Sequence, residues 1–242
     1  MTVSLIIPTL NEAGSIEAVL KEIPRDVVDE VLIVDGASTD GTPELVRRLG
    51  DRVIQQEGRG YGAAIATGFR HVRGDIIVLA DADGSYNLDD IRRLVHRVQD
   101  GADLALGSRY LPESGSEDDT LVRYVGNKVF TWAVRKLYGV ELTDVLFFYA
   151  AMRREVIESI TATSPGFEYI VEFLIKAQRG GFKFAEIPSA EKARTAGKSK
   201  VNALVDGLRM LWIMTLALGV FLVWLGWFIF KEILTKTYTI RK

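Results

Sequence analysis

Two aspartates one residue apart, in Asp81-Ala82-Asp83, are the side chains of this sequence best placed to do chemistry. They follow the apolar run Ile76–Ala80, which predicts a buried strand, and ligands of open α/β sheets bind beyond the carboxyl ends of strands. Carboxylate oxygens favour the hard cations Mg²⁺ and Mn²⁺, which bridge substrate phosphates. The pair therefore predicts a divalent metal site. The alternative is a solvated loop, or a cap for the helix that follows.

More polar and acidic side chains follow two other predicted strands. Asp35 comes after Val31–Val34, and Asn11-Glu12 comes after Val3–Ile7. Like charges crowded at one edge of a sheet are costly unless a cation or hydrogen-bond donors offset them. The three strand ends together therefore favour a ligand site, although Asn11 could instead cap the first helix.

The elements that must position these residues alternate between short apolar runs and amphipathic stretches. Further strands are expected at Val53–Gln55, Leu104–Gly107 and Phe184–Ile187, with an inserted strand at Phe148–Met152. Helical spacing of apolar residues separates these runs. Strand–helix alternation of this kind predicts an α/β fold with a mainly parallel central sheet flanked by helices.

Composition excludes several classes of protein. Hydrophobic residues make up 48% of the 242 residues and charged residues 26%, which excludes global disorder and fibrous repeats. Lys plus Arg is 30 and Asp plus Glu is 32, so the net charge of −2 gives no reason to expect a nucleic-acid partner. The absence of cysteine excludes a disulfide scaffold, a thiolate metal site and a Cys nucleophile.

One long segment, Met210–Phe230, carries no charged residue. As a helix with a rise of about 1.5 Å per residue it would be about 31 Å long, enough to cross a hydrocarbon core of about 30 Å. Trp212, Trp224 and Trp227 lie towards its two ends, where interfacial aromatic residues favour lipid headgroups. The segment predicts membrane contact. Burial in a core, or between copies in a homo-oligomer, is the alternative.

The chain is therefore expected to have three parts: a folded domain over 1–209, an apolar membrane-associated helix over 210–230, and a basic tail over 231–242. A spanning helix would put the basic tail on the far side of the bilayer, against the positive-inside rule, so a helix lying in the interface stays open. No signal peptide is expected, because the chain starts directly with a short strand and a proline.

Several groups of residues, in one order along the chain, resemble the motifs of a known family. They are Ile6-Ile7-Pro8-Thr9-Leu10-Asn11-Glu12, Val34-Asp35-Gly36-Ala37-Ser38-Thr39-Asp40-Gly41, Ala80-Asp81-Ala82-Asp83-Gly84, Gly107-Ser108-Arg109-Tyr110, Asp144, and Arg194-Thr195-Ala196-Gly197-Lys198-Ser199-Lys200. The chain resembles the family-2 glycosyltransferases, which have the GT-A fold, and among them the dolichyl- and polyprenyl-phosphate mannose and glucose synthases.

This resemblance implies an inverting, metal-dependent transfer of a hexose. The donor would be UDP-glucose or GDP-mannose, and the acceptor polyprenyl (dolichyl) phosphate at the cytoplasmic face of a membrane. Asp81 and Asp83 would hold Mg²⁺ or Mn²⁺ and the diphosphate. Further substrate-binding residues would be Pro8, Leu10, Glu12, Asp35 and Asp144. Catalytic roles would fall to Asp83, Arg109, Arg194 and Lys200.

The sequence departs from the family pattern in three places. Ser85 stands where a glutamine is often a further metal ligand, and Gly36 stands where a second acidic residue is common. Phe147-Phe148 replaces a Ser-Gly pair after Asp144, which adds apolar bulk on the acceptor side. The nucleotide is therefore not assigned. A transferase that extends a saccharide acceptor, and a catalytically silent nucleotide-sugar-binding scaffold, remain alternatives.

Two other patterns are weaker. Gly58-Arg59-Gly60-Tyr61-Gly62-Ala63 fits a loose dinucleotide fingerprint, but it does not open the first strand–helix unit as that fingerprint should. His71 and His96 lie on predicted helices without cysteines nearby, so they are expected to be ordinary helix residues rather than metal ligands.

Overall fold

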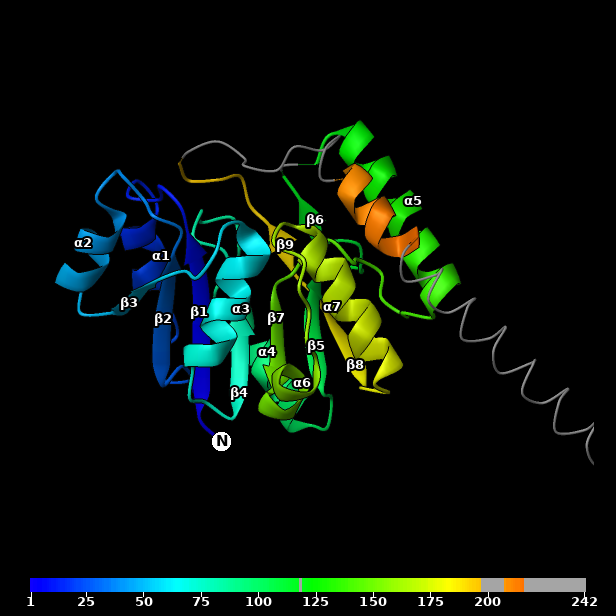
Figure 1. The fold of residues 1–242 in the computed structure, drawn as a ribbon, viewed down its shortest axis with the longest axis horizontal. Helices are drawn as coiled ribbons and strands as arrows, with labels where there is room; N and C mark the ends of the chain where they lie inside the picture. Colours follow the sequence, from blue (N-terminus) through cyan, green and yellow to red (C-terminus); the bar gives the residue numbers. More distant parts are fainter. Residues whose placement is uncertain (118, 197–206, 216–242) are drawn as a thin grey trace, which may run out of the picture.

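The computed structural model describes residues 1–117, 119–196 and 207–215. A 7-stranded sheet in the order β3-β2-β1-β4-β7-β5-β8 forms its centre (Figure 1). Its strands are β1 (Val3–Thr9), β2 (Glu30–Asp35), β3 (Arg52–Gln55), β4 (Ile76–Leu79), β5 (Leu104–Ser108), β7 (Ala150–Arg153) and β8 (Phe184–Pro188). A small second sheet pairs β6 (Gly115–Ser116) with β9 (Ala190–Glu191).

The central sheet is mixed, which corrects the expectation of a mainly parallel sheet. The pairings β3-β2, β2-β1, β1-β4 and β5-β8 are parallel, but β7 is antiparallel to both β4 and β5. The segment that connects β5 to β7 leaves and re-enters the sheet at the same end of the strands, where the Gly107 amide donates to the Tyr149 carbonyl at 2.8 Å. Because β7 starts at the end where β5 stops, it runs antiparallel to β5 and needs no crossover connection.

Helices cover both faces of the sheet, because successive strand residues point to opposite sides. In β1, Ile6 joins one core, while Leu5 and Ile7 join the other. The helices are α1 (Ile16–Glu22), α2 (Thr42–Arg48), α3 (Tyr61–His71), α4 (Asp90–Gln99), α5 (Leu121–Tyr138), α6 (Arg154–Ser159), α7 (Glu168–Arg179) and an unlabelled helix at 207–215. Residues of α1, α2 and α4 bury against one face, and those of α3, α5, α6, α7 and 207–215 against the other.

The chain order reverses between β1 and β4. From β1 the chain steps outward through β2 and β3, and then returns to pair β4 with the free side of β1 (Figure 1). Such a switch point leaves a crevice beyond the carboxyl ends of the two central strands, which is where open α/β sheets bind ligands. Asp81 lies two residues beyond the end of β4 and therefore at this crevice.

The expected membrane helix is described only in part. Met210 and the residues up to 215 lie in the helix at 207–215, whereas 216–230 and the basic tail 231–242 lie outside the described residues. None of the helices within the described ranges is long and apolar enough to cross a bilayer. The membrane-associated helix therefore stays a prediction from the sequence.

Candidate active site

A cavity of about 720 Å³ opens at the switch point. The loops that follow four adjacent strands, the start of α3 and the approach to α7 all contribute to its wall. Its lining residues are Pro8, Leu10, Glu12, Gly36, Ala37, Gln55, Gln56, Gly58, Arg59, Gly60, Tyr61, Ala64, Asp81, Ala82, Asp83, Phe167 and Arg194. The two aspartates predicted to hold a metal thus share one pocket with three of the residues predicted to bind substrate, Pro8, Leu10 and Glu12.

Asp81 has a raised pKa. Burial and the neighbouring charge of Asp83 raise its pKa from 3.8 to about 7, although hydrogen bonds from Tyr61 and Tyr86 and the charge of Arg194 act in the opposite direction. The Tyr61 hydroxyl donates to Asp81 Oδ1 at 3.0 Å. Repulsion between the two carboxylates favours the protonated form of Asp81. A cation bound between them would offset this repulsion and favour the ionised form.

Asp83 forms an ion pair with Arg194. Arg194 Nη1 lies 2.7 Å from Asp83 Oδ2, and the Asp83 side chain is only 5% exposed. The loop that carries Arg194 is held against the aspartates, because the Thr195 amide donates to the Asp83 carbonyl at 3.0 Å. Gly84 permits this approach: its φ is +77°, and a Cβ there would lie 2.2 Å from Thr195 Oγ1. Arg194 Nε is buried with no hydrogen-bond partner among the described residues.

The residues present fit a divalent cation that shares its ligands with a substrate. Asp81 and Asp83 offer hard oxygen ligands on a bend, which brings them into one pocket. Across the described ranges, no group of three or more His, Cys, Asp or Glu side chains is arranged to hold a metal. Mg²⁺ and Mn²⁺ suit such a site, because they accept one or two carboxylates together with waters and phosphate oxygens.

The loops after β1 and β2 are tied together beside the pocket. Asn11, with a φ of 55°, donates its amide to Ser38 Oγ at 2.8 Å and accepts from the Thr39 amide at 2.8 Å. Ser15 occupies the N-cap position of α1, so Asn11 links two loops rather than capping the helix. This link fixes the loop in which Leu10 and Glu12 line the cavity.

Asp35 lies at the end of β2 and is 4% exposed. Its carboxylate accepts from the Thr9 hydroxyl at 3.0 Å, and from the Ser38 hydroxyl at 2.6 Å and amide at 2.8 Å. These contacts shape the loop that presents Gly36 and Ala37 to the cavity. A direct contact of Asp35 with a substrate stays a prediction.

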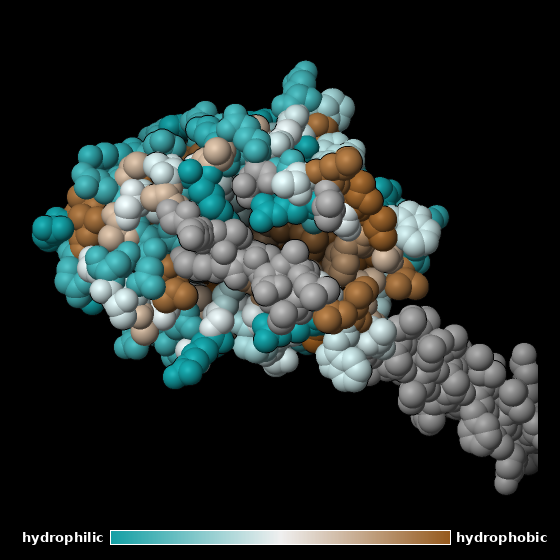
Figure 2. All heavy atoms as spheres, turned by 90° about the horizontal axis from the view of Figure 1, so that it is seen from above, coloured by the Kyte–Doolittle hydropathy of each residue, from teal (hydrophilic) through white to brown (hydrophobic). Residues whose placement is uncertain are grey.

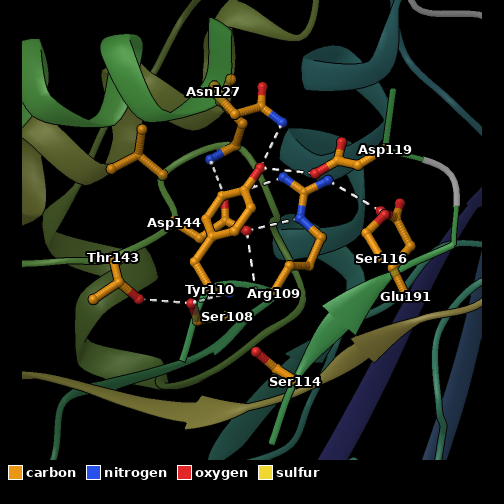
Figure 3. Close-up of polar contacts among 12 residues, drawn as sticks. Ser108, Arg109, Tyr110, Ser114, Ser116, Asp119, Asn127, Thr143, Asp144 and Glu191 are labelled. Atoms are coloured by element: carbon orange, nitrogen blue, oxygen red, sulfur yellow. Dashed lines mark hydrogen bonds and ion pairs between the residues drawn. The ribbon is translucent and has the colours of Figure 1, made fainter. Parts of the chain in front are cut away.

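Arg109 and Asp144 lie in a buried ion cluster. Arg109 Nε and Nη2 donate to the two carboxylate oxygens of Asp144 at 2.7 and 3.1 Å, and Nη1 donates to Glu191 at 3.1 Å (Figure 3). Burial lowers the pKa of the Arg109 guanidinium, but Asp144 and Glu191 outweigh it, so the net direction is upward. The Arg109 side chain is 8% exposed and that of Asp144 is 0% exposed. Arg109 therefore joins three segments next to the pocket.

The cluster connects to the aspartates through Glu191. Glu191 forms an isolated bridge with Tyr86, and hydrogen bonding from Tyr86 lowers the pKa of Asp81. Glu191 also lies three residues before Arg194 in the sequence. Arg109 thus helps to set the position of the loop that carries Arg194. The remaining predicted catalytic residue, Lys200, lies outside the described residues.

The two phenylalanines that depart from the family pattern are core residues on opposite faces of the sheet. Phe147 is 3% exposed and packs with Tyr86 at a ring distance of 4.7 Å, and the Arg109 guanidinium lies 5.0 Å from its ring centre. Phe148 is 2% exposed and packs on Phe173 at 5.7 Å. Phe147 thereby supports the buried ion cluster.

Two aromatic residues of the cavity were not predicted. Tyr61 stacks on Phe167 with ring centres 4.7 Å apart, and both line the cavity. The Gly-rich turn around Tyr61 was the available signal. It opens α3, where a Cβ on Gly60 would lie 2.4 Å from the Pro165 carbonyl oxygen and one on Gly62 2.3 Å from that of Ser164. These glycines allow close packing of α3 rather than forming a dinucleotide site.

A model of one protein family, glycosyl transferase family 2, matches residues 4–161. The chain belongs to this family. The family match covers most of the strands that build the pocket, including both aspartates, and this family-2 glycosyltransferase is therefore a sugar-transferring enzyme, as the motif resemblance implied.

Relatives of this glycosyltransferase include enzymes named for lipid phosphates. A polyprenol monophosphomannose synthase of Mycolicibacterium smegmatis is 34% identical over 82% of this chain and 80% of its own. A dolichyl-phosphate hexose transferase of Haloferax volcanii is 32% identical over 84% of this chain and 88% of its own. A low-salt glycan biosynthesis hexosyltransferase of the same organism, Agl6, is 33% identical over 86% of this chain, which spans only 52% of that relative.

A solved structure shares the fold. Glucosyl-3-phosphoglycerate synthase from Mycobacterium tuberculosis, crystallised with Mn²⁺, UDP-glucose and phosphoglyceric acid, superposes with a TM-score of 0.73 over 90% of this chain and 80% of its own. The sequence identity is 24%, so the likeness establishes the α/β, GT-A-like architecture of this glycosyltransferase and no more.

Proposed function

We propose that this family-2 glycosyltransferase moves a hexose from a nucleotide sugar, UDP-glucose or GDP-mannose, to the phosphate of a polyprenol such as dolichol at a membrane. The reaction would invert the anomeric carbon in a single displacement. The observation that carries the proposal is the convergence of Asp81, Asp83 and Arg194 in one cavity of about 720 Å³. Relatives named for polyprenol and dolichyl phosphate support the choice of acceptor.

In this proposal the loops after β1 to β3 receive the nucleoside. Pro8, Leu10 and Glu12 line that side of the cavity, and the buried carboxylate of Asp35 holds the loop that follows β2. The stacked pair of Tyr61 and Phe167 offers an apolar wall. Since Tyr61 also donates to Asp81, the position of the wall and that of the metal-binding carboxylate are coupled.

Asp81 and Asp83 would hold Mg²⁺ or Mn²⁺, which when bound supplies positive charge to the leaving diphosphate. Arg194, whose Nη1 lies 2.7 Å from Asp83 Oδ2, would also contact the phosphates of the substrates. A guanidinium suits these contacts because its fork matches both carboxylate and phosphate oxygens. Lys200, six residues further along the sequence, would add positive charge.

The acceptor needs no dedicated base in this proposal. The second pKa of a phosphate monoester is about 6, so its oxygen is already ionised near neutral pH. Arg194 then orients the acceptor and offsets its charge, which is a matter of geometry rather than of proton transfer. Arg109 acts as a positioning residue, because its guanidinium is held by Asp144 and Glu191.

The test is a transfer assay with the full chain in detergent. Labelled UDP- and GDP-hexoses are each incubated with polyprenyl phosphate and Mn²⁺, and label in the organic phase is counted. We expect one donor to label the lipid, with release of the matching nucleoside diphosphate, and no labelling when the metal is chelated. Free saccharides serve as competing acceptors.

Two outcomes would replace this proposal with another function. Label found on saccharides and not on polyprenyl phosphate would indicate an enzyme that extends sugar chains. Nucleotide-sugar binding without any release of nucleoside diphosphate would indicate a binding scaffold. Asp89→Asn is a matched control for variants of the metal pair, because the Asp89 side chain is 77% exposed and lies at the N-cap position of α4.

A further inference from the structure

Helix α5 exposes a regular apolar stripe to solvent. Leu121, Val125, Val129 and Trp132 are 79%, 50%, 59% and 61% exposed. Their spacing of three and four residues puts them on one side of the helix. Val134, on another side, is 0% exposed in the core, so α5 already has the buried contact that holds it on the domain. The exposed stripe therefore needs another explanation.

The helix at 207–215 lies beside α5 and repeats the pattern (Figure 1). The Tyr138 hydroxyl at the end of α5 donates to the Met214 carbonyl. Met210 and Met214 are buried, while Leu208, Leu211 and Trp212 are 60%, 50% and 64% exposed. Figure 2 shows hydrophobic residues gathered on this side of the molecule. The exposed apolar residues of the two helices are called here the paired-helix face.

The charged residues within the two helices have one sign. Neither helix contains Asp or Glu. Their basic residues are Arg123, Lys128, Arg135, Lys136 and Arg209. Basic residues are attracted to a bilayer that contains anionic lipid, and Trp and Tyr favour the headgroup region. Trp132, Trp212 and Tyr124 supply such aromatics on the exposed side.

The chain also leaves the described structure at this face. The helix at 207–215 ends the described part, and the sequence after it stays free of charged residues to Phe230. A sequence of that composition is suited to lipid. Any lipid contact it makes would bring the paired-helix face to the same surface.

We propose that the paired-helix face binds the surface of an anionic lipid bilayer, with α5 and the helix at 207–215 lying in the headgroup region. The inference deepens the proposed function, on which it rests for the presence of a membrane. Apolar area and positive charge together are what hold an amphipathic helix in an interface. Docking of this face would bring the domain, and with it the cavity beyond the carboxyl ends of β1 and β4, to the lipid surface.

The absence of cysteine in the whole chain makes a direct test available. Val129→Cys on α5 and Leu211→Cys are each labelled with an environment-sensitive fluorophore in the full chain. Glu44→Cys on α2, where the side chain is 71% exposed, is the matched control. Vesicles contain phosphatidylcholine and phosphatidylglycerol, without polyprenyl phosphate or nucleotide sugar, so the result is independent of sugar transfer.

We expect the labels at 129 and 211 to shift to shorter wavelength on adding vesicles and to be quenched by brominated acyl chains, while the label at 44 stays in water. A label at 129 that stays in water while the protein sediments with vesicles would overturn the inference, because the segment after 215 would then be the sole anchor. A concentration-dependent blue shift without vesicles would also overturn it, and would assign the face to a second copy of the chain.

A second variant separates membrane docking from damage to the fold. Val125→Glu with Val129→Glu places two charges on residues that are already exposed. We expect at least a threefold fall in transfer to long polyprenyl phosphate in vesicles, with transfer to a short, water-soluble polyprenyl phosphate unchanged. Equal losses of transfer activity with both acceptors, or no loss with either, would contradict the proposal that the paired-helix face binds the bilayer.

Discussion

Arg194 Nη1 lies 2.7 Å from Asp83 Oδ2, so a cation of the chain itself neutralises one of the two aspartates that form the predicted metal pair. The contact is largely buried, with side-chain exposures of 26% for Arg194 and 5% for Asp83. A metal ion that binds Asp83 must displace this guanidinium or share the carboxylate with it. The two residues therefore define a competition that can be measured.

Replacing Arg194 by Ala should raise the affinity of the nucleotide-free protein for Mn²⁺. Removing the competing guanidinium is expected to strengthen binding about tenfold, which corresponds to about 1.4 kcal/mol. Transfer activity should fall in the same variant, because the cation that meets the phosphates is gone. Electron paramagnetic resonance of free Mn²⁺ during a titration measures the affinity. Arg194→Lys, which keeps the charge, is the control, and unchanged Mn²⁺ affinity in Arg194→Ala would show that no competition exists.

Replacing Asp83 by Asn should abolish most activity without unfolding the protein. Asn keeps an oxygen that can accept from the Ser85 amide, which lies 2.9 Å from Asp83 Oδ1. It loses the charge that binds the metal, and the loss of one electrostatic contact to a transition state costs about 10² to 10³ in rate. Initial rates at saturating Mn²⁺ measure the effect. Near wild-type turnover in Asp83→Asn, with Asp89→Asn as reference, would remove the metal assignment.

Much of this site could be predicted from the sequence, because the chemistry lies at the ends of strands. Buried apolar runs identify β1, β2 and β4 to within two residues, and Asp81 and Asp83 follow the last of them. Parallel neighbours bring such ends to one edge, so the shared pocket followed from local pattern alone. The reversed β7 could not be read in this way, since strand direction depends on where the chain re-enters the sheet.

Contacts between residues far apart in the sequence could not be predicted from local sequence patterns. Arg109 reaches Glu191 across 82 residues, and Tyr61 reaches Asp81 across 20. The strands β6 and β9 have two residues each, too few for any periodicity. The motif resemblance therefore assigned Arg109 and Asp144 to the site, but it did not predict that they form a buried ion pair.

The metal-free protein should become less stable as pH rises towards 8. Burial and Asp83 raise the pKa of Asp81 to about 7 in the folded state, from 3.8. The folded state thus binds more protons than the unfolded state between these values, and stability falls as pH rises through that window. One pKa unit corresponds to about 1.4 kcal/mol, which bounds the loss at about 4 kcal/mol. Urea unfolding in EDTA at pH 5 and pH 8 measures it.

Asp81→Asn isolates this effect. The variant cannot ionise at residue 81, so the part of the pH dependence that comes from Asp81 should disappear. Saturating Mn²⁺ should reverse the trend in the wild type, because a bound cation stabilises the ionised pair. An identical fall in stability for wild type and Asp81→Asn in EDTA would mean that other groups cause the pH dependence.

Replacing Arg109 by Ala should be among the most destabilising single changes near the site. It leaves the carboxylate of Asp144, with a side chain 0% exposed, without its bidentate partner. Removing one member of a buried pair costs about 3 to 5 kcal/mol, because the remaining charge stays buried and uncompensated. The midpoint of urea unfolding should fall accordingly, with an unchanged dependence on urea concentration.

Arg25→Ala is the matched control, because Arg25 also forms a two-point contact with a carboxylate, that of Asp51, but at the surface. The side chains of Arg25 and Asp51 are 48% and 10% exposed, so solvent screens this pair more than the buried pair of Arg109, and the loss should be smaller. Arg109→Lys keeps the charge but not the fork, so it should fall between the two. If Arg109→Ala were no more destabilising than Arg25→Ala and lost activity all the same, Arg109 would act on the substrate itself and not by positioning the loop of Arg194.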